Sequence, residues 1–418
     1  MQISLVKNFI IITLTTALAV ALFSFFDDGT QATRVLSSQE SNTETSEKIS
    51  PPSEKLANPP EFIKAVYVTA YSAGTRGYLN YLSNLFRTTE INSVVVDVKD
   101  STGKISYASG SQDAKKYGMY NGTVKDIDGL IRFFHDQNIY VIGRIAVFED
   151  PMYARARPDL AIYDAEKTAD KTKPVLWRDN NGLYWMDPAS KDVWDYNISV
   201  AKDALYRGFD EINFDYIRFP SDGNILNASF PVWDETTPEQ TIIKSFFTYL
   251  RSKLSGQKIS ADLFGQVTTN ADDMGIGQLL ENAFENFDYI SPMLYPSHYI
   301  DGFMGFDNPA EHPYEIINYS LATAQAREDA YLKKLQEMPA QQNQSPEASV
   351  APKTAITEVP NLAKFRPWLQ DFNMGADYTS DMVRLEIQAT QASLGTNYKG
   401  FMLWSPSNIY TEGAVIKP

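Results

Sequence analysis

The sequence predicts one large α/β domain, a closed (β/α)8 barrel of the TIM type, and two observations carry this prediction. From about residue 61 onward, eight short runs rich in β-branched and aromatic residues alternate with stretches of helical periodicity. Strands that alternate with helices form a parallel sheet, and eight repeats close it into a barrel. The chain of 418 residues is also long enough for one domain of barrel size with additional segments. A doubly wound open sheet is the alternative, but no glycine-rich phosphate loop follows any of the runs.

The eight predicted strands are separated by segments of helical pattern. The second is continuously apolar up to Asp97, as expected of a parallel strand that is buried on both faces. Between the strands, apolar residues at helical spacing predict helices, such as the one over 377–394 that Gly395 ends. In chain order, the predicted strands are 65–70, 93–100, 140–146, 208–215, 259–265, 289–296, 365–372 and 400–406.

The fourth run, within residues 208–220, carries more charge than a buried strand normally tolerates. It contains Glu211, Asp215 and Arg218, and an unpaired charge inside a protein is costly. Pro220 has no N–H to donate, so the strand must end soon after Asp215. Two interpretations remain open. Either Asp215 and Arg218 form an internal ion pair or strand-end cap, or Asp215 is a catalytic carboxylate at the C-terminal rim of a barrel strand, its usual place.

Two insertions are expected within the domain. Residues 148–187 leave the carboxyl end of the third strand and contain Trp177 and Trp185, and long connections of this kind are often functional. We interpret them as a rim insertion that helps to shape a substrate cleft, with a flap of no functional consequence as the alternative. Residues 338–360 are rich in Gln, Pro, Ser and Ala, which predicts a surface loop.

The N-terminal 60 residues differ in composition from the domain of residues 61–418. Within residues 1–29, an apolar run from Asn8 to Phe26 follows Lys7 and is just long enough to cross a bilayer with its amino end in the cytoplasm. We expect an uncleaved signal anchor, because no clear cleavage site follows the run, and a cleavable signal peptide is the alternative. Residues 30–60, rich in Ser, Thr, Glu, Gln and Pro, predict a disordered linker. The barrel is therefore expected outside the cytoplasmic membrane, anchored to it or secreted.

Composition argues against several classes of partner and site. A net charge of −15 argues against a nucleic-acid binder, because phosphate contacts require a basic surface. The chain has no cysteine, which excludes disulfides and thiolate metal sites. The histidines His135, His298 and His312 are not at ligand spacing, which argues against a histidine-built zinc hydrolase and a metal-dependent deacetylase. We expect neither metal nor cofactor.

Barrel closure would bring the carboxyl ends of all the strands to one face. Glycoside hydrolysis requires two carboxyl groups that flank the bond, one as proton donor and one as nucleophile or base, with aromatic faces for the sugar rings. We predict Asp215 as nucleophile or base and Asp262 as acid, although Asp262 as a helix cap is the alternative. The predicted substrate-binding residues are Asp97, Asp100, Arg218, Tyr295, His298 and Trp404. The other polar residues at the strand ends are Glu149, Asp150, Gln370 and Asp371.

Four stretches resemble the bacterial putative glycoside hydrolase domain, formerly a domain of unknown function: Val94–Asp100, Phe209–Pro220, Ser291–Tyr299 and Phe401–Ser405. The resemblance covers about Lys64 to Thr411. It implies a TIM barrel distantly similar to the α-amylase group, whose strand-four nucleophile is an aspartate that Asp215 matches. Amylase-type enzymes carry an arginine two residues before the nucleophile and a glutamate on strand five. This chain has Asn213 and Asp262 at the corresponding places.

Two functions follow as hypotheses. The first is an exported, membrane-tethered glycoside hydrolase that acts on a cell-envelope or extracellular polysaccharide. The second is a non-catalytic carbohydrate-binding barrel that serves as an envelope scaffold. The arrangement of the carboxyl groups at the mouth is the feature that separates them, because a hydrolase needs its two carboxyl groups to face one bond.

Overall fold

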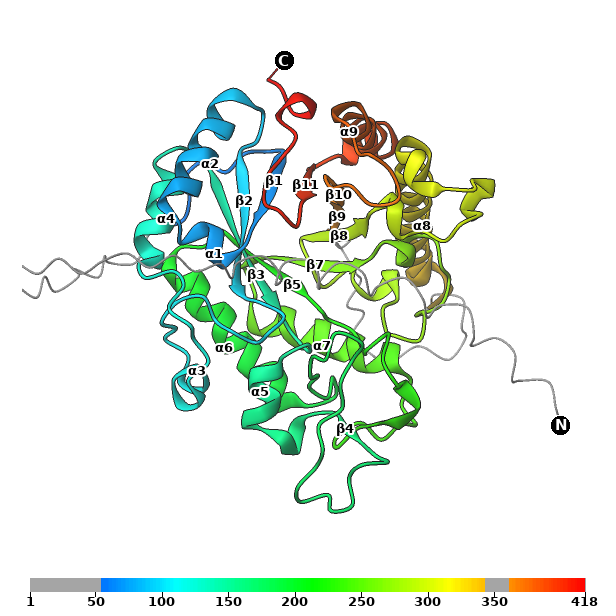
Figure 1. Cartoon of the computed structure of the whole chain (residues 1–418). Coiled ribbons are helices and arrows are strands. Elements are labelled where there is room, and N and C mark those ends of the chain that lie inside the picture. The colour runs from blue at the N-terminus through cyan, green and yellow to red at the C-terminus, as the bar shows by residue number, and fades with distance from the viewer. Residues whose placement is uncertain (1–53, 343–360, 418) are drawn as a thin grey trace, which may run out of the picture.

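The computed structural model describes residues 54–342 and 361–417. It confirms the predicted closed barrel of parallel strands, with helices around it (Figure 1). The seventh strand of the barrel is in two pieces that both pair with the sixth, and the last strand pairs with the first to close the ring. The barrel strands are β1 (Ile63–Val68), β2 (Ser93–Lys99), β3 (Tyr140–Ala146), β5 (Glu211–Asp215), β7 (Lys258–Phe264), β8 (Tyr289–Leu294), β9 (Lys364–Phe365), β10 (Trp368–Gln370) and β11 (Gly400–Trp404).

The helices cover the outside of the barrel, and α8 and α9 lie side by side, joined by a hydrogen bond from Asn318 Nδ2 to Ser393 Oγ (2.9 Å). A short antiparallel pair, β4 (Tyr163–Asp164) with β6 (Ala228–Ser229), lies outside the barrel sheet. The helices are α1 (Ala70–Ala73), α2 (Arg76–Thr88), α3 (Gln112–Tyr117), α4 (Ile127–His135), α5 (Pro151–Ala156), α6 (Lys191–Arg207), α7 (Glu239–Lys253), α8 (Pro313–Gln342) and α9 (Ser380–Leu394).

The chain reaches β5 through a sharp turn at the end of α6. Gly208 ends this helix with φ 107°, a left-handed conformation that glycine adopts at little cost, and its N–H donates to Ala204 O. β5 then ends at Asp215, as the sequence predicts. The short segment after Asp215 therefore stands at the carboxyl end of the barrel.

The inward-facing side chains divide the barrel into two halves, because successive residues of a strand point to opposite faces. Around β1 and β11 the interior is apolar and includes Ile63, Ala65 and Met402. On the opposite side of the ring, around β5 and β7, it is polar. The buried side chains there are Glu211, Asn213, Asp215, Ser260 and Asp262.

A buried ion pair between Glu211 and Arg366 lies in this polar half. Both side chains are fully excluded from solvent, and the guanidinium of Arg366 donates through both terminal nitrogens to the carboxylate of Glu211. Ser260 Oγ donates to the same carboxylate (2.6 Å), and the ring of Tyr289 lies 4.1 Å from the guanidinium carbon. Each charge is therefore stabilised by the other in place of water.

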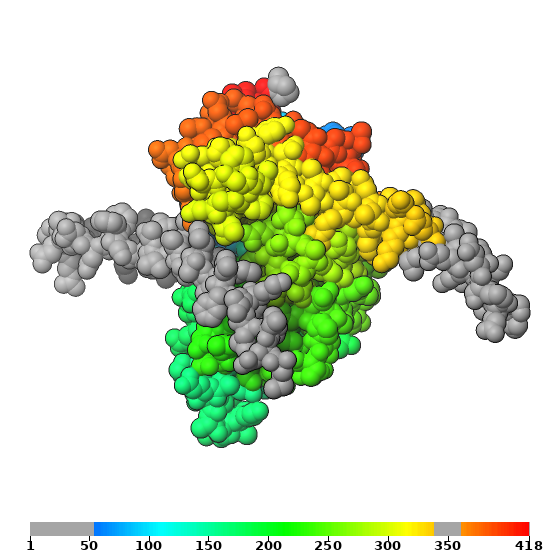
Figure 2. All heavy atoms as spheres, turned by 90° about the vertical axis from the view of Figure 1, so that its right-hand side faces the viewer, coloured from blue at the N-terminus to red at the C-terminus, as the bar shows by residue number. Residues whose placement is uncertain are grey.

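The insertion over 148–187 forms α5 and β4 and protrudes from one end of the molecule (Figures 1 and 2). It packs against the domain through two buried tryptophans. Trp177 Nε1 donates to Asn224 O (2.8 Å), and the ring of Trp185 lies 5.9 Å from that of Tyr216. Because β4 pairs with β6, the insertion is joined to the segment that follows β5.

The remaining expected segments are only partly described. Leu56 N donates to Asp210 Oδ1 (2.7 Å) and Lys55 Nζ to Gln257 Oε1 (2.9 Å), so the end of the expected 30–60 linker contacts the barrel where β5 and β7 begin. The first residues of the expected 338–360 loop continue α8, which ends at Gln342. None of the helices within residues 54–342 and 361–417 combines the length and apolar character needed to span a bilayer. The run Asn8–Phe26 and the remainder of the two segments lie outside the described residues.

The buried pair generates a prediction about stability. Replacing one partner, as in Glu211→Gln or Arg366→Met, should lower the free energy of unfolding by about 3–5 kcal/mol, because an uncompensated charge or polar group remains inside. The double variant should lose less than the sum of the two single variants. Urea unfolding measures all three. Glu337→Gln, which removes a surface pair with Lys333, is the control and should cost less than about 1 kcal/mol. Single-variant losses as small as that of the control would contradict the prediction.

Candidate active site

The carboxyl ends of four adjacent strands place charged side chains toward one another. They are Asp97 on β2, Arg144 on β3, Asp215 on β5 and Asp262 on β7. Asp97 and Arg144 are direct partners in the register of β2 and β3. The main chains of β3 and β5 align Ala146 with Asp215. Barrel closure thus gathers three carboxyl groups and one guanidinium at the mouth.

Arg144 joins two of these carboxyl groups. It donates to Asp215 Oδ2 through Nε (3.0 Å) and Nη2 (2.6 Å), and to Asp97 Oδ1 through Nη1 (2.7 Å). Tyr67 on β1 donates its hydroxyl to the other oxygen of Asp97 (2.5 Å). Bidentate arginine–carboxylate contacts are strong and directional. Arg144 therefore fixes the orientation of Asp215 and compensates its negative charge.

We expected Arg218 to be the cationic partner of Asp215, but the structure gives that contact to Arg144. Arg218 is buried, and its Nη1 donates to Phe219 O (2.9 Å) and Ser221 Oγ (3.1 Å). The physical reason is register: Arg144 lies on β3, which pairs with β5, so its guanidinium reaches Asp215, whereas Nη1 of Arg218 is bonded within the turn that follows β5. Arg218 still lies in the same electrostatic environment as Asp215.

The turn after Asp215 has a strained backbone. Tyr216 has φ 53°, in the left-handed region that a bulky residue rarely occupies, and its N–H donates to Asp215 Oδ1 (2.6 Å). Strain of this kind persists where surrounding contacts over-determine the conformation, and it clusters at functional sites. Both oxygens of Asp215 are thereby held, one by Arg144 and one by the Tyr216 amide.

Asp262 lies deeper, with only 1% of its surface exposed. Its Oδ1 accepts hydrogen bonds from Asn213 Nδ2 (2.8 Å) and from Trp368 Nε1 (2.8 Å). Burial raises the pKa of Asp262 well above its usual range, and the negative charge of Asp215 raises it further. Because Oδ1 is occupied by two donors, the proton belongs on Oδ2. That oxygen has no hydrogen bond from a described residue, yet it is not sealed from solvent.

An aromatic cluster lies on the β8–β11 side of the mouth. Trp404 at the end of β11 lies 5.7 Å from the ring of Tyr295 and 5.0 Å from that of Phe372. His298 packs against Tyr295 (5.3 Å), and burial lowers the pKa of His298 to about 4, so this imidazole is neutral at physiological pH. Of the expected substrate-binding residues, the structure thus groups Tyr295, His298 and Trp404.

Asp100 is used differently from our expectation for it. Its Oδ1 accepts from Thr102 N (2.8 Å) and Thr102 Oγ1 (2.6 Å), so the carboxylate caps the turn after β2. Aspartate side chains commonly bond the backbone two residues on, and sequence alone does not separate this use from a contact with substrate. The structure therefore gives Asp100 a local partner and brings Asp97, rather than Asp100, into the charged cluster.

Three residues of the cluster were missed in the sequence: Arg144, Asn213 as a donor to Asp262, and Trp368. A signal for Arg144 was present, because it is the only charged residue in the otherwise apolar and neutral run Tyr140–Ala146. A charge at the centre of a buried strand needs a partner. No comparable signal marks Trp368, which reaches Asp262 from β10, with β8 between their two strands.

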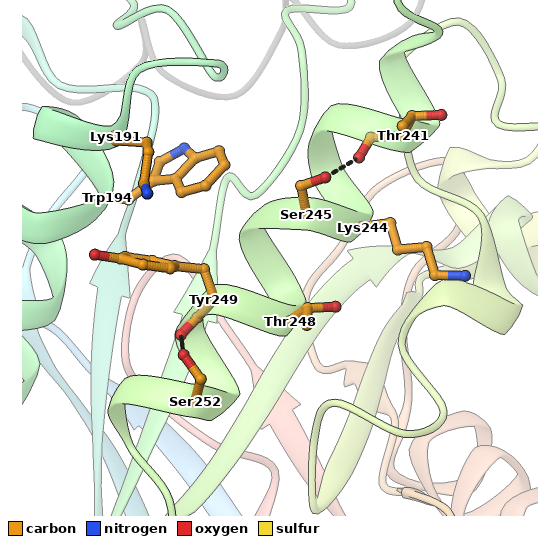
Figure 3. A pocket seen from close by; sticks show the side chains of 8 residues that line it. All are labelled: Lys191, Trp194, Thr241, Lys244, Ser245, Thr248, Tyr249 and Ser252. Carbon is orange, nitrogen blue, oxygen red and sulfur yellow. Dashed lines mark hydrogen bonds between the residues drawn. The ribbon is translucent and has the colours of Figure 1, made fainter. Parts of the chain in front are cut away.

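Two further features bear on the chemistry of the site. Among residues 54–342 and 361–417, no group of three or more His, Asp or Glu side chains could hold a metal ion. A groove of about 520 Å³ lies on the outside of the barrel between α6 and α7, where Trp194 and Lys191 face Tyr249 (Figure 3). None of the strand-end carboxyl groups lines this groove, so we place the candidate active site at the mouth.

The barrel has recognisable relatives among solved structures. The glycoside hydrolase domain of PgaB (BpsB) from Bordetella bronchiseptica is 11% identical over 83% of this chain and 95% of that chain, with a TM-score of 0.55, which shows a shared fold. A hypothetical protein from Ruminiclostridium thermocellum ATCC 27405 is 36% identical over 50% of this chain and 98% of that chain, with a TM-score of 0.43. The α-galactosidase TtGalA from Thermus thermophilus is 15% identical over 87% and 61% of the two chains, with a TM-score of 0.45.

No curated protein matches the chain. Residues 65–410 match the model of a family described as "Putative glycosyl hydrolase domain". This match spans almost the whole barrel, including Asp97, Asp215 and Asp262. The chain therefore belongs to that family, and glycoside hydrolysis is the activity class that its membership supports.

Proposed function

We propose that the protein is a glycoside hydrolase in which Asp215 acts as the ionised carboxylate and Asp262 as the proton donor. One observation carries this assignment: the two side chains extend from adjacent strands into environments that favour opposite protonation states. Arg144 and the Tyr216 amide stabilise a negative charge on Asp215. Burial and the Asp215 charge raise the pKa of Asp262 and keep it protonated. Such a divergent pair is the usual arrangement for acid–base chemistry in one site.

The chemistry follows from this pair. The proton on Asp262 Oδ2 transfers to the glycosidic oxygen as the bond to the anomeric carbon breaks, so the leaving sugar departs as a neutral alcohol. Asp215 either attacks the anomeric carbon or removes a proton from an attacking water, and these two routes give retained and inverted products. The guanidinium of Arg144 stays with Asp215 and Asp97 throughout, which holds the attacking oxygen in place.

We propose a cell-envelope or extracellular polysaccharide as the substrate class. The support is the aromatic group of Tyr295, Phe372 and Trp404 at the same mouth as the carboxyl groups, because aromatic faces bind the apolar faces of sugar rings. The extracytoplasmic location rests on the apolar run Asn8–Phe26 in the sequence. The alternative function is a binding scaffold without catalysis, and the following experiments distinguish it from a hydrolase.

The first prediction separates the two roles by leaving-group dependence. Asp215→Asn should lower turnover by about 10³-fold or more on every glycoside, because it removes the attacking carboxylate. Asp262→Asn should be equally impaired on polysaccharide but largely restored on aryl glycosides with an acidic phenol, which leave without protonation. Kinetics on a panel of polysaccharides and matched aryl glycosides measures this.

Asp381→Asn is the control, because Asp381 is a surface residue on α9 with 82% of its side chain exposed, and it should keep wild-type rates. Wild-type turnover by Asp215→Asn would contradict the mechanism. Sugar binding without any turnover by the wild-type protein would favour the scaffold.

The second prediction concerns pH. Since Asp262 must be protonated to act, kcat/KM should fall as pH rises through its elevated pKa, and this alkaline limb should disappear in Asp262→Asn on aryl glycosides. Replacing Arg144 with Met should shift the limb to higher pH, because the positive charge of Arg144 lowers the pKa of Asp262 and this effect is lost in the variant. A limb unchanged in Asp262→Asn would show that another group is the acid.

A further inference from the structure

A fourth carboxyl group near the mouth, that of Glu149, interacts with Asp215 and has no role in the mechanism above. It follows β3 and only 4% of its surface is exposed. Its main chain is fixed, because Glu149 forms a β-bridge with Trp185 and the preceding residue, Phe148, donates its N–H to Tyr216 O (3.2 Å). Glu149 is thus held between the insertion and the strained turn after Asp215.

The side chain of Glu149 is not used to hold the fold together. No described residue donates a hydrogen bond to its carboxyl oxygens or forms an ion pair with them. Neither carboxyl oxygen of Glu149 is fully closed off from solvent, so water can reach them. A carboxyl group that is more than nine-tenths buried and unpartnered is costly unless something outside the chain bonds to it.

Arg218 is the cation that most strongly lowers the pKa of Glu149. Its guanidinium carbon lies 4.7 Å from the ring of Trp185 and 4.6 Å from that of Phe264, while Nη1 is bonded to Phe219 O and Ser221 Oγ. These contacts fix the guanidinium plane. Arg218 and Glu149 influence each other electrostatically, yet they do not form an ion pair in the described structure. Glu149 bonds to Trp185 through a β-bridge, and the guanidinium of Arg218 lies on the ring of the same Trp185, which packs on Tyr216 directly after Asp215. The two groups are therefore neighbours in the region beside Asp215.

We infer that Glu149 and Arg218 form a clamp for two neighbouring hydroxyl groups of the sugar bound at Asp215. This inference rests on the proposed function for the location of that sugar. A vicinal diol supplies one hydroxyl that donates to the carboxyl oxygen of Glu149 and another that accepts from the guanidinium of Arg218. The clamp selects a neutral pyranose whose adjacent hydroxyls are free.

The charge around the clamp supports a neutral sugar. Burial raises the pKa of Glu149 well above its usual range, while Arg218 opposes this rise. Near the clamp, Arg144 is already paired with Asp215, so its guanidinium is not free to bind a uronate. A hydroxyl can both donate and accept, so it bonds to Glu149 in either protonation state. A site built to bond a hydroxyl strongly rejects an analogue that lacks it.

The test measures binding in the Asp215→Asn background, so that it does not depend on turnover. The probes are the methyl glycosides of glucose, galactose and mannose and their monodeoxy analogues. Their binding is measured by saturation-transfer NMR titration. At least one parent glycoside should bind, and removing either of two adjacent hydroxyls should weaken it about tenfold. Adding Glu149→Leu should weaken binding of the parent glycoside by a similar factor and leave binding of the corresponding deoxy sugar unchanged. Glu149→Gln should keep most of the affinity.

Glu149→Ala, which introduces no larger side chain, replaces Glu149→Leu if the latter does not fold, and thermal unfolding of each variant checks this. The clamp would be overturned if the parent and deoxy glycosides bound equally well. It would also be overturned if a Glu149 variant bound both glycosides as tightly as Asp215→Asn alone does. Failure of every methyl glycoside to bind would overturn it for neutral pyranosides. If Asp215→Asn keeps wild-type turnover, the hydrolase mechanism fails, while these binding results still judge the clamp separately.

Discussion

The structure depends on the neutralisation of charge inside one half of a barrel. Carboxyl groups that would be too costly as isolated buried anions are stabilised by arginines from other strands: Glu211 by Arg366 below, and Asp97 and Asp215 by Arg144 at the mouth. Asp262, which has no such cation, accepts two neutral donors and holds its proton instead. The contacts that make the fold stable therefore also give each carboxyl group a different electrostatic environment.

This arrangement ties the rim to the core. The turn at Tyr216 is strained, and the insertion over 148–187 packs Trp185 against it at a ring distance of 5.9 Å. The insertion also positions Glu149 and supports Arg218. A segment that interrupts the strand–helix alternation thus supplies the contacts that hold the turn after Asp215. The aromatic residues of the opposite rim complete a mouth with one charged and one apolar side.

Sequence patterns were sufficient for the fold and insufficient for the partners within the site. Alternating runs predicted the barrel, and the charge in 208–220 with Pro220 correctly placed the end of β5 at Asp215. Partners across a barrel are set by register and closure, which no local pattern encodes. Arg218 is close to Asp215 in sequence but bonds to Phe219 O and Ser221 Oγ, whereas Arg144, 71 positions distant, makes the contact with Asp215. Asp100 shows the converse, since one oxygen of a strand-end acid can bond within its own turn.

The central claim is that two neighbouring carboxyl groups are held in opposite protonation states before any substrate arrives. Infrared difference spectroscopy at neutral pH, comparing wild type with Asp262→Asn and Asp215→Asn, tests it directly because a protonated carboxyl group absorbs apart from a carboxylate. The account predicts that Asp262→Asn removes a protonated carboxyl band and that Asp215→Asn removes a carboxylate band. Loss of a carboxylate band in Asp262→Asn, with no change in the protonated region, would contradict it.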